Sequence, residues 1–73
     1  MEKDIKHKLG RNIKIERIRK DLTQEDFAEK IDMSLSHVSK IEKGITSPTA
    51  IALFKMARVL NVPMEKFFDG IAF

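Results

Sequence analysis

Residues 23–44, TQEDFAEKIDMSLSHVSKIEKG, constrain the fold of this chain more than any other segment. The spacing of the apolar residues predicts two short amphipathic helices joined by a tight turn. Thr23 is expected to cap the first helix, and Asp26, three residues later, can complete a capping box. Leu22 and Phe27 have the spacing of a hydrophobic staple across this cap.

The second helix of the pair has a polar outer surface. Ser34 is expected to cap it, Val38 and Ile41 to point inward, and Gly44 to end it. Its outer residues are mostly short and polar, and two are lysines: Leu35, Ser36, His37, Ser39, Lys40 and Lys43. Side chains of this kind can enter the major groove of DNA without a clash. The pair therefore predicts a helix-turn-helix that reads DNA, with its core at about residues 23–44.

The segments on either side predict three further helices. A first helix over about residues 4–20 would place Ile5, Leu9 and Ile13 on one face. A short fifth helix over about residues 64–68 would close the core with Phe67 or Phe68. No alternating apolar pattern typical of a strand occurs. The fold class predicted for residues 1–73 is a single all-α domain of five helices.

The fourth helix is expected to begin at Ser47 and Pro48, as its cap and its first-turn proline. Asn61 can adopt the left-handed conformation that ends it. The inward residues have helical spacing, with Ile51 or Phe54 helping at the edges: Leu53, Met56, Ala57 and Leu60.

The positive charge is concentrated near the start of the chain. Residues 1–20 carry eight lysines and arginines against three acidic residues, whereas residues 21–73 carry six against eight. A basic first helix beside the second helix of the pair would form a surface that faces DNA phosphates. A solvated charged face is an equally good explanation for any single lysine in that helix.

Several classes of protein are excluded by what the chain lacks. There is no cysteine, and His7 and His37 are far apart, so we expect no metal site and no cofactor. No apolar run approaches the roughly 20 residues of a membrane span, and the first residues are not those of a signal peptide, so we expect a cytoplasmic protein. No set of nucleophile, base and orienting residue is recognisable, so we expect neither an enzyme nor a small-molecule substrate.

From Leu9 to Phe68 the chain resembles the Cro/cI-type helix-turn-helix family, also called the xenobiotic-response-element or lambda-repressor-like family. The matching segments are LTQEDFAEKI, S-x-x-x-V-S-K-I-E-K-G, SPT and KMARVLNVPMEKFF. The agreement covers more than three quarters of the chain and includes the order of the helices, the loop lengths and the caps. The resemblance implies a compact five-helix domain that binds pseudo-palindromic operators on double-stranded DNA as a dimer and regulates transcription.

The resemblance also implies roles for individual residues. Four residues occupy positions that contact bases: Leu35, Ser36, Ser39 and Lys40. Four more occupy positions that contact DNA phosphates: Gln24, Thr23, His37 and Lys43. Arg17 and Glu42 resemble a partly buried ion pair that joins the first helix to the reading helix.

Two of these roles have alternatives. Leu35 stands where relatives often have glutamine; it can touch a thymine methyl group, or fold back onto Met33 and read nothing. Lys40 can reach a guanine, and a phosphate contact is almost as good an assignment.

The chain departs from the family pattern in several places. Asp21 and Asp32 stand where glycine is preferred for a left-handed turn, which aspartate tolerates at a small cost. Residues 45–47 lack the lysine or arginine that many relatives carry there, so we expect weaker non-specific binding to DNA. Glu16 replaces an inward leucine, and Ile15 and Ile18 are expected to be partly exposed.

The last seven residues contain four large apolar side chains. Phe68, Ile71 and Phe73 would form a symmetric dimer patch that reaches Val59 or Val62. Alternatively, this tail folds back over Ile15 and Ile18 of its own first helix.

We therefore predict a sequence-specific DNA-binding regulator of transcription, a repressor that acts as a homodimer. The alternative is an antitoxin or controller protein that binds its own promoter and also a partner protein. An exposed apolar surface away from the DNA would favour this alternative, and four residues are candidates for it: Ile15, Ile18, Ile71 and Phe73.

Overall fold

The described part of the chain contains four α-helices and one 3₁₀ helix, which confirms the predicted all-α class. The computed structural model describes residues 2–72, and no strand occurs among them. The elements are α1 (Glu2–Arg19), α2 (Gln24–Lys30), α3 (Leu35–Glu42), α4 (Ala50–Leu60) and the 3₁₀ helix η1 (Met64–Phe68). Within residues 2–72 no helix is long and apolar enough to cross a membrane.

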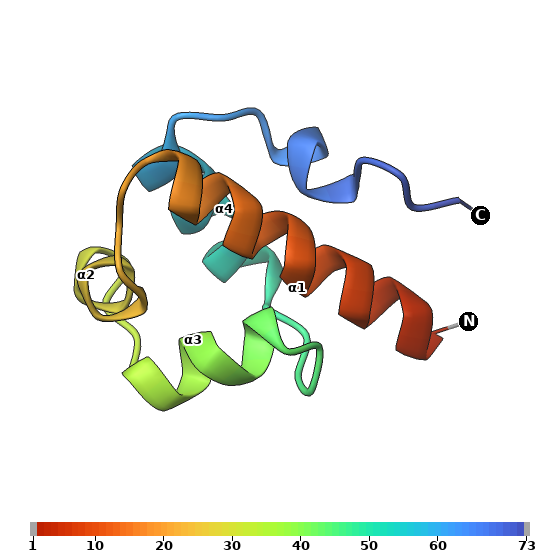
Figure 1. The fold of residues 1–73 in the computed structure, drawn as a ribbon, viewed down its shortest axis with the longest axis horizontal. Coiled ribbons are helices and arrows are strands. Elements are labelled where there is room, and N and C mark those ends of the chain that lie inside the picture. The colour runs from red at the N-terminus through yellow and green to blue at the C-terminus, as the bar shows by residue number, and fades with distance from the viewer. Residues whose placement is uncertain (1, 73) are drawn as a thin grey trace.

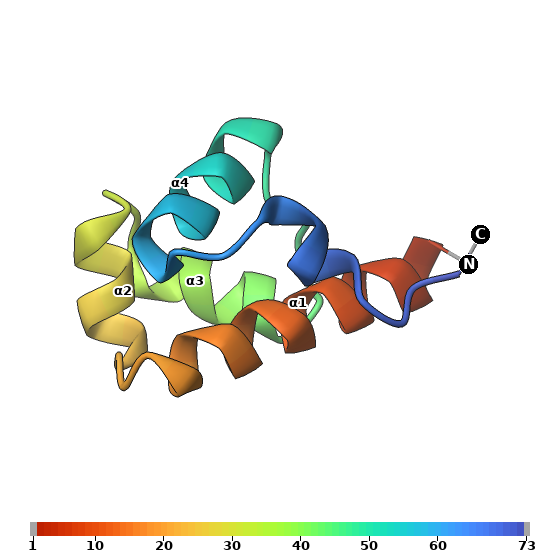
Figure 2. The same cartoon turned by 90° about the horizontal axis from the view of Figure 1, so that it is seen from above.

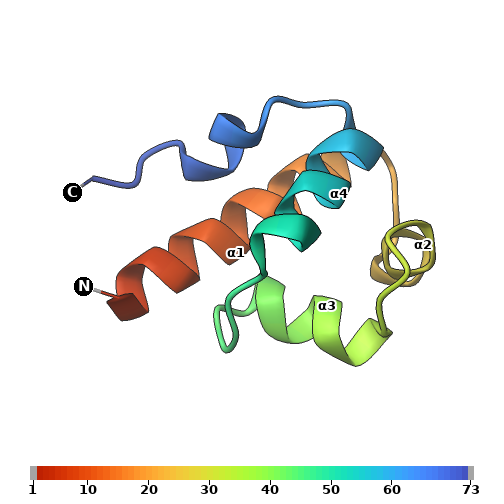
Figure 3. The same cartoon turned by 180° about the vertical axis from the view of Figure 1, so that it is seen from behind.

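The long helix α1 organises the others around itself. It packs against α3 on one side and against η1 on the other (Figure 1). Seen from above, α2 lies at the end of the molecule opposite the two chain ends (Figure 2). Figure 3 shows from behind that α4 lies across α1, between α3 and η1. Since α2 packs mainly on α3, the helix pair forms one end of the domain.

The caps of the helix pair are those that the sequence predicts. The hydroxyl of Thr23 accepts a hydrogen bond from the backbone N–H of Asp26 at 3.0 Å, and the Asp26 carboxylate accepts one from the Thr23 N–H at 3.4 Å. The Ser34 hydroxyl accepts from the N–H of His37 at 3.1 Å. These bonds satisfy N–H groups that have no partner within the helices.

Left-handed residues set the turns around the helix pair. Asp21 and Asp32 have φ values of 56° and 57°, as expected for aspartates that replace turn glycines. Gly44 follows α3 with φ of 78°, and Asn61 ends α4 with φ of 55°. These four residues give the chain its direction between helices, and all four were expected in these positions.

One core joins all five elements. Its largest fully buried side chains are Phe27 of α2 and Phe67 of η1, and burying each contributes about 1.5–3 kcal/mol to folding. The core residues are Leu9, Ile13, Phe27, Ala28, Ile31, Val38, Ile41, Leu53, Met56, Ala57, Leu60 and Phe67. Of the two alternatives for closing the core, Phe67 is the residue used, because Phe68 is 37% exposed.

The prediction for the start of α4 was wrong. Thr49, rather than Ser47, caps the helix by accepting a hydrogen bond from the Ala52 N–H at 3.1 Å, and Pro48 lies before the cap. The expected edge residues Ile51 and Phe54 are 71% and 54% exposed, because they lie on the side of α4 that faces away from Leu53 and Met56. The Arg58 guanidinium lies 5.7 Å from the centre of the Phe54 ring.

Gly10 is where α1 and α3 come closest. A Cβ atom at this position would overlap the carbonyl oxygen of Ile41 and would lie 2.9 Å from that of Glu42. Both atoms belong to the backbone of α3, so a flexible side chain cannot move aside to make room. Sequence analysis did not single out Gly10, because a glycine inside a helix does not reveal which neighbour it accommodates.

We expect Gly10→Ala to lower the free energy of unfolding by at least about 1–3 kcal/mol, because the added methyl group must push α3 away from α1. This loss should exceed the small gain that alanine brings to helix formation. Chemical denaturation followed by circular dichroism measures it. Gly70→Ala is the control, since a Cβ there meets nothing within 4 Å and its cost comes from a φ of 77° alone. Equal losses in the two variants would contradict the close packing of α1 on α3.

Candidate nucleic-acid interface

The outer face of α3 carries the residues that the sequence assigned to base contacts. Val38 and Ile41 are completely or almost completely buried, so the opposite face of α3 is turned to solvent. Of the predicted set, Leu35, Ser36 and Lys40 are exposed. The fourth member, Ser39, is half-buried between them and the core. The four residues therefore lie along the outer side of α3, over about two turns of the helix.

Leu35 is the first residue of α3 and directly follows the cap residue Ser34. Its side chain is 46% exposed, whereas Met33 packs partly against the core. The apolar side chain at the tip of the helix is therefore open to solvent. His37 and Lys43, the predicted phosphate contacts of α3 and its C-cap, are exposed as well.

A buried hydrogen-bonded cluster holds α3 against the two preceding helices. Glu42 accepts from the Arg17 guanidinium at 2.7 and 3.1 Å, and both side chains are more than 90% buried. A third donor of the same guanidinium bonds the carbonyl oxygen of Leu22 at 2.6 Å. The predicted ion pair between Arg17 and Glu42 is present, in the bidentate geometry that binds a carboxylate most strongly.

Gln24 belongs to the same cluster. Its side-chain amide donates to the Glu42 carboxylate at 2.9 Å, so the carboxylate receives donors from both α1 and α2. Gln24 is also the first residue of α2, with its neighbour Thr23 at the N-cap. The phosphate contacts predicted for Gln24 and Thr23 would form at this helix N-terminus. Sequence analysis missed the contact between Gln24 and Glu42, because it assigned Gln24 to a phosphate only and local spacing does not connect the two residues.

Glu16 is a buried acidic residue at a position where the resemblance implies an inward leucine. It is 7% exposed, and its carboxylate pairs with Arg19 at 2.9 Å. The outward residues Ile15 and Ile18 are 39% and 53% exposed, as expected. The cation one turn away offsets part of the cost of burying this carboxylate.

Asn12 holds the C-terminal segment against α1. Its amide donates to the backbone oxygens of Phe67 and Asp69, at 2.8 and 2.9 Å. Of the predicted dimer patch, Phe68 is exposed and Ile71 packs partly against the core, while Phe73 lies outside the described residues. Sequence analysis did not identify Asn12, because its partners lie 55 and 57 residues away in the sequence.

We expect Glu42→Ala to lower the free energy of unfolding by about 3–5 kcal/mol, because Arg17 would stay buried without its counter-ion. Thermal and urea denaturation measure this loss. Asp69→Ala is the control: it breaks the exposed pair with Lys66 at 3.4 Å and should cost no more than about 1 kcal/mol. A Glu42→Ala variant as stable as the control would show that the buried pair does not stabilise the fold.

Comparison with known proteins identifies the family. The profile of the HTH_3 family, described as helix-turn-helix, matches residues 13–67. The control protein C.MunI of Mycoplasma sp is 32% identical over 69 residues, which cover 93% of each chain. An uncharacterised HTH-type transcriptional regulator of Methanocaldococcus jannaschii is 40% identical over 48 residues, covering 66% of this chain and 73% of that protein.

A solved structure also has the same fold. The restriction-modification controller protein C.AhdI from Aeromonas hydrophila superposes with a TM-score of 0.81 at 26% identity, over 85% of this chain and 94% of that one. The family profile, the relatives and the solved structure all indicate a helix-turn-helix protein, as does the exposed outer face of α3. The chain belongs to the HTH_3, Cro/C1-type family of helix-turn-helix DNA-binding transcriptional regulators.

Proposed function

We propose that this protein binds a pseudo-palindromic operator as a homodimer, with α3 of each subunit in the major groove. The observation that carries this proposal is the exposed, mostly polar face of α3, held in place by a cap at Ser34 and by the buried Glu42. A rigid helix that presents short side chains is the geometry that base readout requires. The protein would act in the cytoplasm by binding, without catalysis or a cofactor.

The proposed contacts divide into base readout and backbone positioning. Leu35 at the tip of α3 would touch a thymine methyl group, and Ser36 and Ser39 would accept or donate hydrogen bonds. Lys40 would donate to a guanine. Four residues would bind phosphates and set the register of the helix on the duplex: Gln24, Thr23, His37 and Lys43.

By occupying a promoter, a dimer of this kind would repress transcription. The second candidate is a controller protein that binds DNA next to its own gene and also a partner protein. It is favoured by the similarity to the control protein C.MunI, which extends over 93% of both chains. Footprinting on DNA that flanks the gene tests both candidates, and a transcription assay with that DNA separates repression from activation.

We expect Lys40→Ala to weaken operator binding by about 1–3 kcal/mol and to relax the preference at one base pair in each half-site. Selection from random duplexes followed by fluorescence anisotropy measures both effects. Lys66→Ala, on η1 and across α1 from α3, is the matched control and should leave operator binding unchanged. An equal loss on all sequences would assign Lys40 to a phosphate. No loss at all would remove it from the site.

The proposed dimer contact lies in the C-terminal segment, at Phe68, Ile71 and Phe73. A two-fold dimer must hold its two α3 helices about 34 Å apart to enter successive major grooves. Phe68 is 37% exposed, and a symmetric contact between two subunits would cover the Phe68 side chain of each. α4 also presents an uncovered apolar surface, at Ile51 and Phe54.

We expect Phe68→Ser to weaken dimerisation at least about tenfold, because central aromatic residues supply most of the binding energy at such contacts. Sedimentation equilibrium over a range of concentrations measures the change, and the helical signal should persist. Ile51→Ser is the control on α4. Should Ile51→Ser dissociate the dimer while Phe68→Ser does not, the contact lies on α4 and the C-terminal proposal is wrong.

A further inference from the structure

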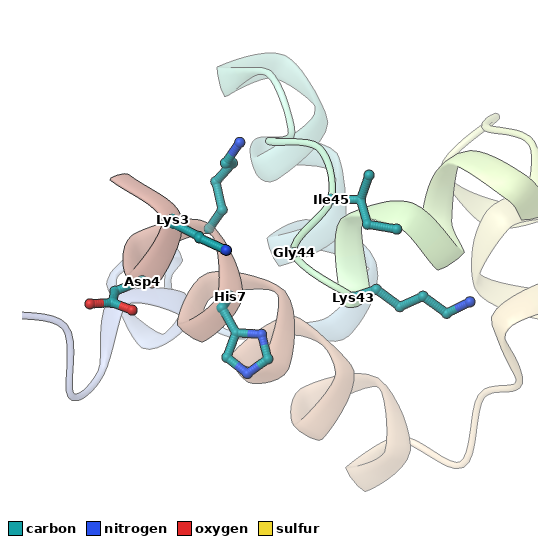
Figure 4. Close-up of a pocket in the computed structure, with 7 residues that line it drawn as sticks. Lys3, Asp4, His7, Lys43, Gly44 and Ile45 are labelled. Carbon is teal, nitrogen blue, oxygen red and sulfur yellow. The ribbon is translucent and has the colours of Figure 1, made fainter. Parts of the chain in front are cut away.

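A basic groove lies where the start of α1 meets the loop after α3. It has a volume of about 780 Å³. Lys3, Lys6 and His7 line it from α1, and Lys43 lines it from the C-terminal end of α3 (Figure 4). Asp4 is the acidic residue at the rim, and in Figure 4 its carboxylate points away from the loop.

Gly44 fixes the two walls of this groove to each other. A Cβ atom at Gly44 would lie 2.7 Å from the Cα and 3.1 Å from the backbone nitrogen of His7. The backbone of the loop therefore touches the second turn of α1 directly. This contact brings the start of α1 next to the end of α3, although some 40 positions separate Lys3 from Lys43, and in Figure 4 the Lys43 side chain extends away from Lys3.

The groove supplies the charge that the loop itself lacks. Residues 45–47 contain no lysine or arginine, and Ile45 is 58% exposed there. Lys3, Lys6 and Lys43 place three cations around this uncharged loop. In Figure 1 the loop after α3 lies beside the first turns of α1, and Lys43, the C-cap of α3, also lines the groove.

We propose that this groove binds phosphate groups of the DNA backbone next to the major-groove site of α3. The inference rests on the proposed function, in which α3 enters the major groove. Lysines on flexible stems are point charges that suit sequence-independent phosphate contacts. Lys43 belongs to both surfaces, so one run of the backbone can pass from α3 into the groove. The expected weakness of non-specific binding is thereby compensated by residues from α1.

The test compares two double variants that lose the same charge. Lys3→Ala with Lys6→Ala removes the α1 lysines of the groove, and Lys8→Ala with Lys66→Ala removes two lysines that face elsewhere. Successive residues turn by 100°, so Lys8 points about 140–160° away from Lys3 and Lys6. Binding to a duplex of arbitrary sequence and to a selected operator is measured over a range of salt concentrations.

The groove variant should have a salt slope shallower by about two than the parent, since each lost phosphate contact changes the slope by about 0.9. Its loss of affinity should be equal on the operator and on the arbitrary duplex. The control variant should keep the parental slope. A conservative variant, Lys3→Arg with Lys6→Arg, should keep it too, because only the charge is needed.

The outcomes separate this inference from the proposed function. A parent protein that binds no selected duplex overturns the proposed function itself. A parent that binds, with the groove variant and the control variant giving the same slope, overturns the groove alone. A shallower slope in the arginine variant also overturns it, since the effect would then come from damage to α1. Sedimentation of the groove variant should match the parent, and dissociation of a dimer would assign the lysines to the dimer contact instead.

Discussion

The position of the reading helix α3 depends on the hydrogen bonds that the Glu42 carboxylate accepts. This carboxylate lies at the end of α3 and receives donors from Arg17 of α1 and Gln24 of α2. A buried carboxylate is costly without partners, so separating α1 from α3 would leave two buried charges unpaired, and moving α2 would remove one further donor. The same cluster extends through Arg17 to the carbonyl oxygen of Leu22, where the chain enters α2. The position of α3 relative to the N-terminus of α2 is therefore set by directional bonds in addition to apolar packing.

Local rules explain which parts of the fold were predictable. The caps at Thr23 and Ser34 and the left-handed turns at Asp21 and Asp32 depend on a few neighbouring residues, and all of them are present. The predicted start of α4 was wrong by two residues, because the sequence offers two possible caps, Ser47 and Thr49. Only packing decides between them. Apolar residues at helical spacing identified Leu53 and the rest of the α4 core.

Contacts between distant segments could not be predicted from local spacing, and the pair of Arg17 and Glu42 was expected only because of the family resemblance. Three contacts of this kind were missed: the close approach of Gly10 to α3, the two hydrogen bonds of Asn12, and the hydrogen bond from Gln24 to Glu42. Each is formed by residues that are far apart in the sequence. Nothing in the local pattern says which helix face will meet which. The candidate site divides in the same way. The exposed face of α3 follows from the periodicity of its apolar residues. The groove beside Gly44 depends on the packing of the start of α1 against the loop after α3, which the sequence does not show.

The contact at Gly10 has a mechanical consequence. Between most helices a layer of side chains can shift and absorb a displacement, but here backbone lies directly on backbone. Protein interiors compress little, and at Gly10 no side chain lies between the two backbones. At this point α1 and α3 cannot approach each other further, so a shift of one helix toward the other must move both. A displacement of the first turns of α1 by a bound molecule should therefore also move α3 at this junction.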